Sequence, residues 1–110
     1  MSESCYWVYI LHCSNGSYYT GYTNDLQKRY QSHLNGTGKC KYTRSFKPLT
    51  IAQCWKIESD KSFAMQLERK IKSLTRSEKE KIIAKPSLLA IDPRVKTMTK
   101  KARDHYMDKL

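Results

Sequence analysis

Hydrophobic and polar residues follow one another at the start of the chain in a pattern that predicts a β-hairpin. Residues 5–13 (CYWVYILHC) are apolar or aromatic on both alternating faces, which is typical of a strand buried at the centre of a sheet. Ser14, Asn15 and Gly16 then supply a turn, and residues 17–22 form a second β-favouring run. Two antiparallel strands joined by this turn are therefore expected.

The next segments predict a helix, a basic loop and a third strand. Thr23 or Asn24 can cap a helix that continues to about Leu34. Residues 35–48 combine glycines and a proline with four basic side chains, which is typical of a loop. Apolar residues then alternate with more polar ones, which indicates a strand with Leu49, Ile51, Trp55 and Ile57.

Two further helices follow this strand. Ser59 or Asp60 can cap the first of them. Its apolar stripe recurs every three or four residues, at Phe63, Leu67, Ile71 and Leu74. Thr75 and Glu78 have the spacing of a capping box, which predicts a helix that continues to about residue 85 and ends before Pro86.

A final amphipathic helix is expected near the C-terminus. Asp92 and Pro93 have the form of a cap and a first-turn proline. The apolar positions of this helix are Val95, Met98, Ala102 and Tyr106. The patterns together predict an α/β (α+β) fold, with a small, mainly antiparallel sheet of three strands flanked by helices and an additional C-terminal helix. The length indicates one domain, at residues 1–85, followed by a basic extension at 86–110.

Net charge indicates a polyanionic partner. The chain has 21 Lys and Arg against 10 Asp and Glu, a net charge of +11. No acidic residue occurs between Leu26 and Ile57. A solvated face that only aids solubility is the alternative, but large fields of one sign are usually avoided unless they bind something. Nucleic acid is favoured over a membrane because no segment combines a basic face with a long apolar one.

The cysteines and the N-terminus contain no motif that indicates another class of protein. Four cysteines lie far apart, without a C-x-x-C pair, at Cys5, Cys13, Cys40 and Cys54. They are expected to be reduced and mostly buried. The apolar run from Trp7 to Leu11 is too short for a signal peptide or a membrane span, so a cytoplasmic location is expected.

Two tyrosines of the hairpin are candidate catalytic residues if they share a face of the sheet. A two-residue Asn-Gly turn places Tyr19 opposite His12 and turns Tyr9 to the other face. A three-residue loop, with Gly16 as a left-handed bulge, places Tyr19 opposite Leu11 and on the face of Tyr9. The sequence permits both registers, and ordinary strand aromatics are the alternative interpretation.

Three further candidates lie at the borders of buried helix faces. Arg29 and His33 flank the apolar face that contains Leu26, where a guanidinium can grip a phosphate and an imidazole can exchange a proton. Glu68 lies at the border of the next apolar stripe. It can hold Mg²⁺ together with a substrate phosphate, or form an exposed ion pair with Lys72.

These residues together resemble the GIY-YIG nuclease superfamily, and most of all its small, single-domain bacterial branch. The resemblance covers approximately residues 5–84. Residues 7–9 (WVY) resemble the end of the first family motif and residues 19–21 (YTG) the second. Residues 42–44 (YTR) resemble a segment typical of the small branch. Valine and threonine replace the isoleucines of the two motifs, and tryptophan replaces the first glycine. An asparagine found late in the domain of several relatives has no counterpart among residues 75–83.

The resemblance implies a metal-dependent DNA endonuclease that is linked to DNA repair or processing. It assigns the catalytic roles to Tyr9, Tyr19, Arg29 and His33 and the metal site to Glu68. Mg²⁺ is the expected metal, with Mn²⁺ as a substitute. Either tyrosine can act as the general base, and His33 can relay a proton or orient a tyrosine. The missing asparagine favours the alternative of a non-catalytic nucleic-acid-binding module with the same fold.

The basic loop is expected to bind the substrate. Its candidate residues are Lys39, Lys41, Tyr42, Arg44 and Lys47. Their charges suit phosphates and the tyrosine can stack on an exposed base. Phosphate contacts carry little sequence information, so a preference for nucleic-acid structure is expected. DNA is the predicted partner. RNA, a protein partner and the oligomeric state stay open.

Overall fold

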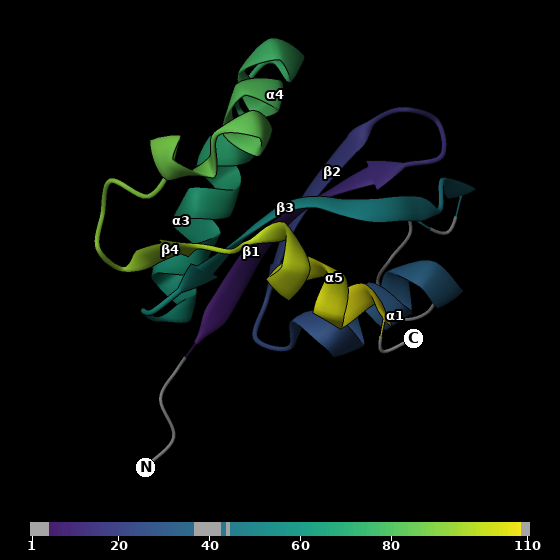
Figure 1. Cartoon of the computed structure of the whole chain (residues 1–110), viewed down its shortest axis with the longest axis horizontal. Coiled ribbons are helices and arrows are strands. Elements are labelled where there is room, and N and C mark those ends of the chain that lie inside the picture. Colours follow the sequence, from purple (N-terminus) through teal and green to yellow (C-terminus); the bar gives the residue numbers. More distant parts are fainter. Residues whose placement is uncertain (1–4, 37–42, 44, 109–110) are drawn as a thin grey trace.

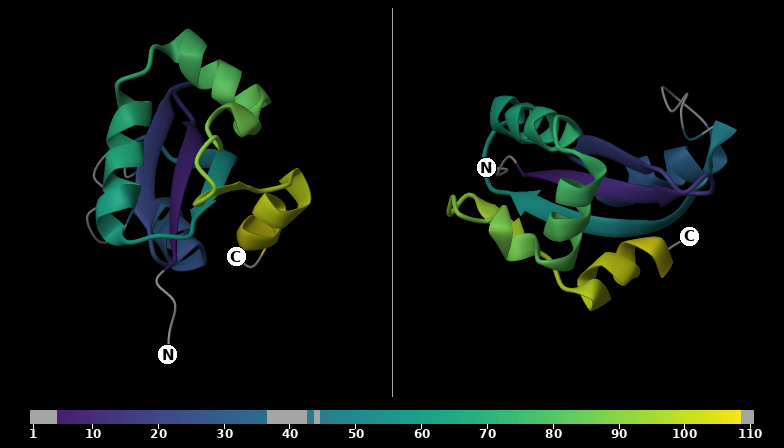
Figure 2. Two further views of the ribbon diagram at one scale, coloured as in Figure 1. Left: turned by 90° about the vertical axis from the view of Figure 1, so that its left-hand side faces the viewer. Right: turned by 90° about the horizontal axis from the view of Figure 1, so that it is seen from above.

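The computed structural model describes residues 5–36, 43 and 45–108. These residues form one sheet with helices on both of its faces (Figure 1, Figure 2). In chain order the elements are β1 (Tyr6–Cys13), β2 (Tyr18–Thr23), α1 (Leu26–Asn35), β3 (Pro48–Ile57), α3 (Lys61–Lys72), α4 (Arg76–Ala84), the 3₁₀ turn η1 (Pro86–Leu88), β4 (Val95–Thr97) and α5 (Lys100–Asp108).

The sheet is antiparallel and has four strands in the order β2-β1-β3-β4. The α+β class is therefore confirmed, whereas the predicted number of three strands is wrong. The missed strand is β4, which pairs with residues 55–57 of β3 and is too short to show an alternation in the sequence. α3 covers β1 and β2 on one face, and α1 and α5 lie together on the other (Figure 2).

Each face of the sheet has its own hydrophobic core because side chains alternate along β1. Val8 and Ile10 point toward α3, whereas Tyr9 and Leu11 point toward α1. The first core is completed by Trp55, Ile57, Ala64, Leu67, Ile71, Ile82 and Val95. The second core is completed by Cys13, Leu26, Tyr30, Ile51 and Cys54. The described cysteines are free thiols, and two of the three are buried in this second core.

The predicted apolar face of β3 is wrong because the strand contains a bulge. The pairing with β1 passes over Ala52, so Ile51 lies on the face of Leu11 while Trp55 lies on the opposite face. A second irregularity passes over Leu49, whose side chain is 63% exposed. The four apolar residues therefore do not share one face, because an extra residue reverses the alternation of side chains that follow it.

The predicted helix caps are correct for α3 and α4 but not for α1. Asp25 caps α1, and its side chain accepts a backbone N–H of the first turn at 3.1 Å. The backbone N–H of Asp25 itself donates to the Thr23 hydroxyl at 3.0 Å, which places Thr23 outside the helix. Of the two caps considered for α3, Asp60 is the one observed. The capping box of Thr75 and Glu78 is confirmed.

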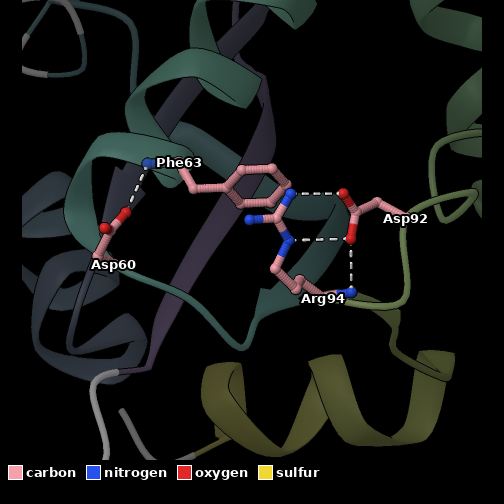
Figure 3. A network of polar contacts seen from close by, with 4 residues as sticks. All are labelled: Asp60, Phe63, Asp92 and Arg94. Carbon is pink, nitrogen blue, oxygen red and sulfur yellow. Dashed lines mark hydrogen bonds and ion pairs between the residues drawn. The ribbon is translucent and has the colours of Figure 1, made fainter.

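The segment before the last helix is a turn and a strand, so the predicted start of that helix at Asp92 and Pro93 is wrong, whereas the predicted C-terminal helix itself is confirmed as α5. The Asp92 carboxylate accepts two hydrogen bonds from the Arg94 guanidinium and one from its backbone N–H (Figure 3). The same guanidinium lies over the Phe63 ring, 4.0 Å from its centroid. This turn is thereby held against α3, and Val95 then enters β4. α5 begins five residues after Val95.

Arg103 fastens α5 to the sheet. Its Nη1 donates to Oε1 of Gln53 at 2.7 Å, and Nε2 of Gln53 donates to the Ile83 carbonyl on α4 at 2.8 Å. Residues 86–108 therefore contribute both β4 and a helix on the second face of the sheet.

Candidate active site

The loop between β1 and β2 has three residues, which selects one of the two registers that the sequence permits. Cys13 donates its backbone N–H to the Ser17 carbonyl at 2.9 Å, and Gly16 has a left-handed φ of 83°. Tyr19 consequently lies opposite Leu11. Since Leu11 and Tyr9 are two residues apart on β1, both tyrosines lie on the same face of the sheet.

Gly21 leaves room for the Tyr9 ring. The two residues are directly opposite in the β1–β2 pairing. A Cβ atom on residue 21 would lie 2.6 Å from Cζ of the Tyr9 ring, far inside van der Waals contact, and would also collide with the phenol oxygen. The Tyr9 side chain therefore crosses the backbone of β2 at the one strand residue that has no side chain.

His33 is buried behind the two tyrosines. Its Nε2 forms a hydrogen bond with the Tyr9 hydroxyl at 2.8 Å, and its Nδ1 forms one with Oγ1 of Thr43 at 2.7 Å. The Tyr19 ring packs edge-on against the imidazole, with 5.3 Å between centroids. His33 is 1% exposed, so it lies within the core and not at its border as expected.

Burial, and to a lesser extent the positive charge of nearby Arg29, lowers the pKa of His33 to about 4. At neutral pH the imidazole therefore carries no charge, and one of its two nitrogens holds the single proton. An uncharged His33 satisfies both of its nitrogens without placing an unpaired cation in the core.

A cavity of about 300 Å³ brings together four of the predicted site residues, Tyr9, Tyr19, Arg29 and Glu68. Among the described residues its lining consists of Tyr6, Tyr9, Tyr19, Gly21, Tyr22, Thr23, Asn24, Arg29, Lys61 and Glu68. Arg29 is exposed at this cavity. None of residues 75–83 is among the described residues that line it.

The cavity lies at the outer edge of the sheet, beside β2, with which no described strand other than β1 pairs. Tyr22 packs toward the first core and Tyr19 toward the second, yet both line the cavity. Helices that cover opposite faces can therefore contribute to one site. α1 places Arg29 there and α3 places Glu68 there.

Two residues that the sequence patterns did not identify also belong to this region. Lys61 lines the cavity seven residues before Glu68, and this spacing places both on one side of α3. Lys61 could have been identified in the sequence from its spacing to Glu68. Thr43 is 1% exposed and contacts His33, and only its position in residues 42–44 drew attention to it.

Glu68 can hold a hydrated divalent cation. It is the single carboxylate among the described residues that line the cavity, and its side chain is 18% exposed. The described part of the chain contains no cluster of three or more His, Cys, Asp or Glu residues that could enclose a metal. One carboxylate with a substrate phosphate and water suits Mg²⁺, which keeps much of its hydration when bound. The single carboxylate of the described lining therefore fits a divalent cation that keeps much of its hydration.

The predicted nucleic-acid-binding residues are only partly within the described chain. Lys39, Lys41, Tyr42 and Arg44 lie outside the described residues, and Lys47 is exposed. Among the described helices, none is long and apolar enough to cross a membrane.

Comparison with known proteins places the chain in a family. The model of the GIY-YIG catalytic domain matches residues 5–81. The chain belongs to the GIY-YIG family. The matched range agrees with the extent of the resemblance predicted from the motifs, and the GIY-YIG domain indicates a nuclease-type hydrolase that acts on nucleic acid.

Relatives of this chain occur in both bacteria and archaea. A UPF0213 protein of Bacillus velezensis is 42% identical over 83 residues, which cover 76% of this chain and 82% of the relative. A UPF0213 protein of Halobacterium salinarum is 48% identical over 73 residues, which cover 66% and 92%. The solution NMR structure of a UPF0213 protein of Bacillus halodurans aligns at 35% identity with a TM-score of 0.46, over 79% of this chain and 94% of that one.

The close approach of Tyr9 to Gly21 predicts a specific loss of stability. Gly21→Ala is expected to destabilise the fold by about 1–3 kcal/mol, because the added methyl group displaces the Tyr9 ring. The free energy of unfolding in urea measures this loss. The same substitution in a Tyr9→Ala background is expected to be much milder. Equal losses in the two backgrounds would show that the ring is not the cause.

The lowered pKa of His33 predicts that the fold loses stability in mild acid. Between pH 6.5 and about 4 the unfolded chain binds a proton at His33 that the folded chain does not, so stability falls as the pH falls through this range. The loss from pH 7 to pH 5 is expected to be about 2 kcal/mol. Urea unfolding of the natural chain and of His33→Asn at both pH values measures it. Equal pH dependence in the two proteins would contradict the prediction.

Proposed function

We propose that this chain is a metal-dependent endonuclease that hydrolyses phosphodiester bonds in DNA. The observation that supports this most is the convergence of two phenols, a guanidinium and a carboxylate on one cavity. Hydrolysis of a phosphodiester needs a base for water, positive charge at the phosphoryl oxygens and help for the departing oxygen. The residues of the cavity can supply each of these.

Tyr9 is the proposed general base. Its oxygen is held by His33 at 2.8 Å and its ring is confined over Gly21, so its position is defined from two sides. A free tyrosine is a poor base at neutral pH, since its pKa is about 10. The nearby cations Arg29 and Lys61 favour the phenolate, which can take a proton from water as the water attacks phosphorus. Tyr19 orients the water or the phosphate from the same face.

Arg29 is proposed to bind the non-bridging oxygens of the scissile phosphate. Its side chain is exposed at the cavity, and a planar guanidinium can donate two parallel hydrogen bonds to a phosphate. Lys61 lines the same cavity and adds a second positive charge. These cations stabilise the charge that accumulates on the phosphoryl group as the bond breaks.

Glu68 is the proposed metal-binding residue. Mg²⁺, or Mn²⁺ in its place, would supply further charge stabilisation at the phosphate and the departing 3′ oxygen when bound. In this structure Glu68 pairs with Lys72, with 3.5 Å between Oε2 and Nζ. Partly exposed ion pairs contribute only about 0–1 kcal/mol, so a divalent cation can replace the ammonium.

The substrate is proposed to be DNA of particular structure, as in repair or processing. The basic loop would bind phosphates, which are present in every sequence. The charge of the chain and the acid-free run from residue 26 to residue 57 support this mode of binding.

A non-catalytic nucleic-acid-binding module is the second candidate. The observation that favours it is the ion pair of Glu68 with Lys72, which occupies the one carboxylate of the described cavity lining. Such a module would bind DNA with the same salt sensitivity and would not cleave it.

Cleavage assays with Mg²⁺ or Mn²⁺ are expected to detect nicking of at least one substrate among plasmid, single-stranded, flap and branched DNA. Tyr9→Phe, Arg29→Ala and Glu68→Gln are each expected to lower the rate by about 100-fold or more. Glu58→Gln, an exposed carboxylate outside the cavity, is the matched control and should cleave normally.

Undiminished nicking by both Tyr9→Phe and Glu68→Gln would reject the proposed assignment. Salt-sensitive binding of every substrate by the natural chain, without cleavage of any, would support the binding module instead.

Neutralising the basic loop is expected to weaken DNA binding and its dependence on salt. The triple variant Lys39→Ala, Lys41→Ala, Arg44→Ala should reduce the slope of log affinity against log salt by about 0.9 for each phosphate that the loop no longer neutralises. The control replaces three exposed lysines elsewhere by alanine and removes the same charge, at Lys81, Lys85 and Lys96. Equal effects of the two triple variants on the slope would indicate general charge attraction without a specific role of the loop.

A further inference from the structure

A buried chain of polar groups runs from the cavity to Thr43. It consists of the Tyr9 hydroxyl, the His33 imidazole and the Thr43 hydroxyl, joined at 2.8 Å and 2.7 Å. The three residues are 2%, 1% and 1% exposed. Tyr9, the proposed base, is the end of this chain of hydrogen bonds that lies at the cavity, and Thr43 is the other end.

The proton of His33 can lie in two places, with opposite consequences for Tyr9. A neutral imidazole has one N–H and one acceptor nitrogen, while each hydroxyl can donate or accept. If Nδ1 holds the proton, it donates to Thr43, and Tyr9 must donate its own proton to Nε2. If Nε2 holds the proton, it donates to the Tyr9 oxygen, and Thr43 donates to Nδ1.

Only the second arrangement suits a tyrosine that acts as a base. A phenolate oxygen has no proton to donate, so it needs a donor at Nε2. In the first arrangement the phenol proton would have to move onto His33 and form a buried imidazolium. Burial and the charge of Arg29 disfavour that cation, and they hold the pKa of His33 at about 4.

We propose that Thr43 is a positioning residue for the hydrolysis: its hydroxyl donates to Nδ1 of His33, which keeps the imidazole proton on Nε2, where it is donated to the Tyr9 oxygen. This deepens the proposed nuclease function and rests on it. Proton transfer is balanced within the step, since the Tyr9 phenolate takes one proton from the attacking water and His33 retains its own. The β-branched side chain of Thr43 restricts rotation about χ1, which helps to hold Oγ1 next to Nδ1 of His33.

The experiment compares Thr43→Val, which keeps the shape and removes the hydroxyl, with Thr43→Ser, which keeps the hydroxyl. Nitrogen-15 NMR of the full chain at pH 7, without nucleic acid, distinguishes protonated from unprotonated imidazole nitrogens. The His33 signals are assigned by their absence in His33→Asn. We expect a protonated Nε2 in the natural chain and in Thr43→Ser, and a shift of the proton toward Nδ1 in Thr43→Val. A proton on Nδ1 in the natural chain, or unchanged signals in Thr43→Val, would overturn the proposal.

Cleavage as a function of pH tests the role in the reaction. Among the described residues, the charged groups that line the cavity with Tyr9 are Arg29, Lys61 and Glu68, and none is altered by a change at Thr43. Thr43→Val is therefore expected to lower kcat about tenfold at pH 7, to regain activity at higher pH and to bind DNA normally, while Thr43→Ser behaves as the natural chain. An equal loss at every pH would overturn the role.

The two arms separate the failure of this inference from the failure of the proposed function. If the proton moves in Thr43→Val but neither the natural chain nor Thr43→Ser cleaves DNA, the proposed nuclease function is rejected and the hydrogen-bond direction assigned to Thr43 is supported.

Discussion

The Tyr9 phenol reaches both the cavity and His33 only because the β1–β2 hairpin has a three-residue loop. That loop places Gly21 opposite Tyr9 and Tyr19 opposite Leu11. A slip of one residue would turn one of the tyrosines to the other face of the sheet. The missing side chain at Gly21 then leaves the surface of β2 open to the ring. Register and glycine together define where the phenol oxygen lies, and the other groups of the site are arranged around it.

The outer edge of the sheet, beside β2, allows a chain of only 110 residues to assemble a site from both faces of that sheet. Helices on opposite faces are separated by the sheet everywhere except at such an edge. Arg29 on α1 and Glu68 on α3 meet there with the tyrosines. The described lining of the cavity consequently brings the side chains of Arg29 and Lys61 together with the carboxylate of Glu68.

In this site the charged guanidinium lies at the surface, and the buried imidazole is uncharged. Arg29 is exposed, so its charge can remain hydrated, whereas His33 is 1% exposed and uncharged at neutral pH. Burying a neutral imidazole between two hydroxyls satisfies its nitrogens at little cost, while burying a cation would cost far more. The interior therefore holds and orients the phenol, and the charged groups at its surface are available to the substrate.

Local sequence determined the parts of this protein that depend on neighbouring residues. The central strand, the cap at Asp60 and the capping box at Thr75 follow from propensity and short-range hydrogen bonds, which act over a few positions. The family motifs likewise indicated Tyr9 and Arg29 because their spacing survives in the linear chain. The sequence also showed directly that residues 26–57 contain basic side chains and no acidic ones.

Tertiary structure decided the parts that depend on residues far apart in the chain. It selected the hairpin register, added β4 to the sheet and reversed the side-chain alternation at Ala52 through a bulge. It also buried His33 between Tyr9, 24 positions away, and Thr43, ten positions away. Periodicity places a residue on a face of its own element, whereas depth, pairing and hydrogen-bond partners exist only after the elements pack against one another.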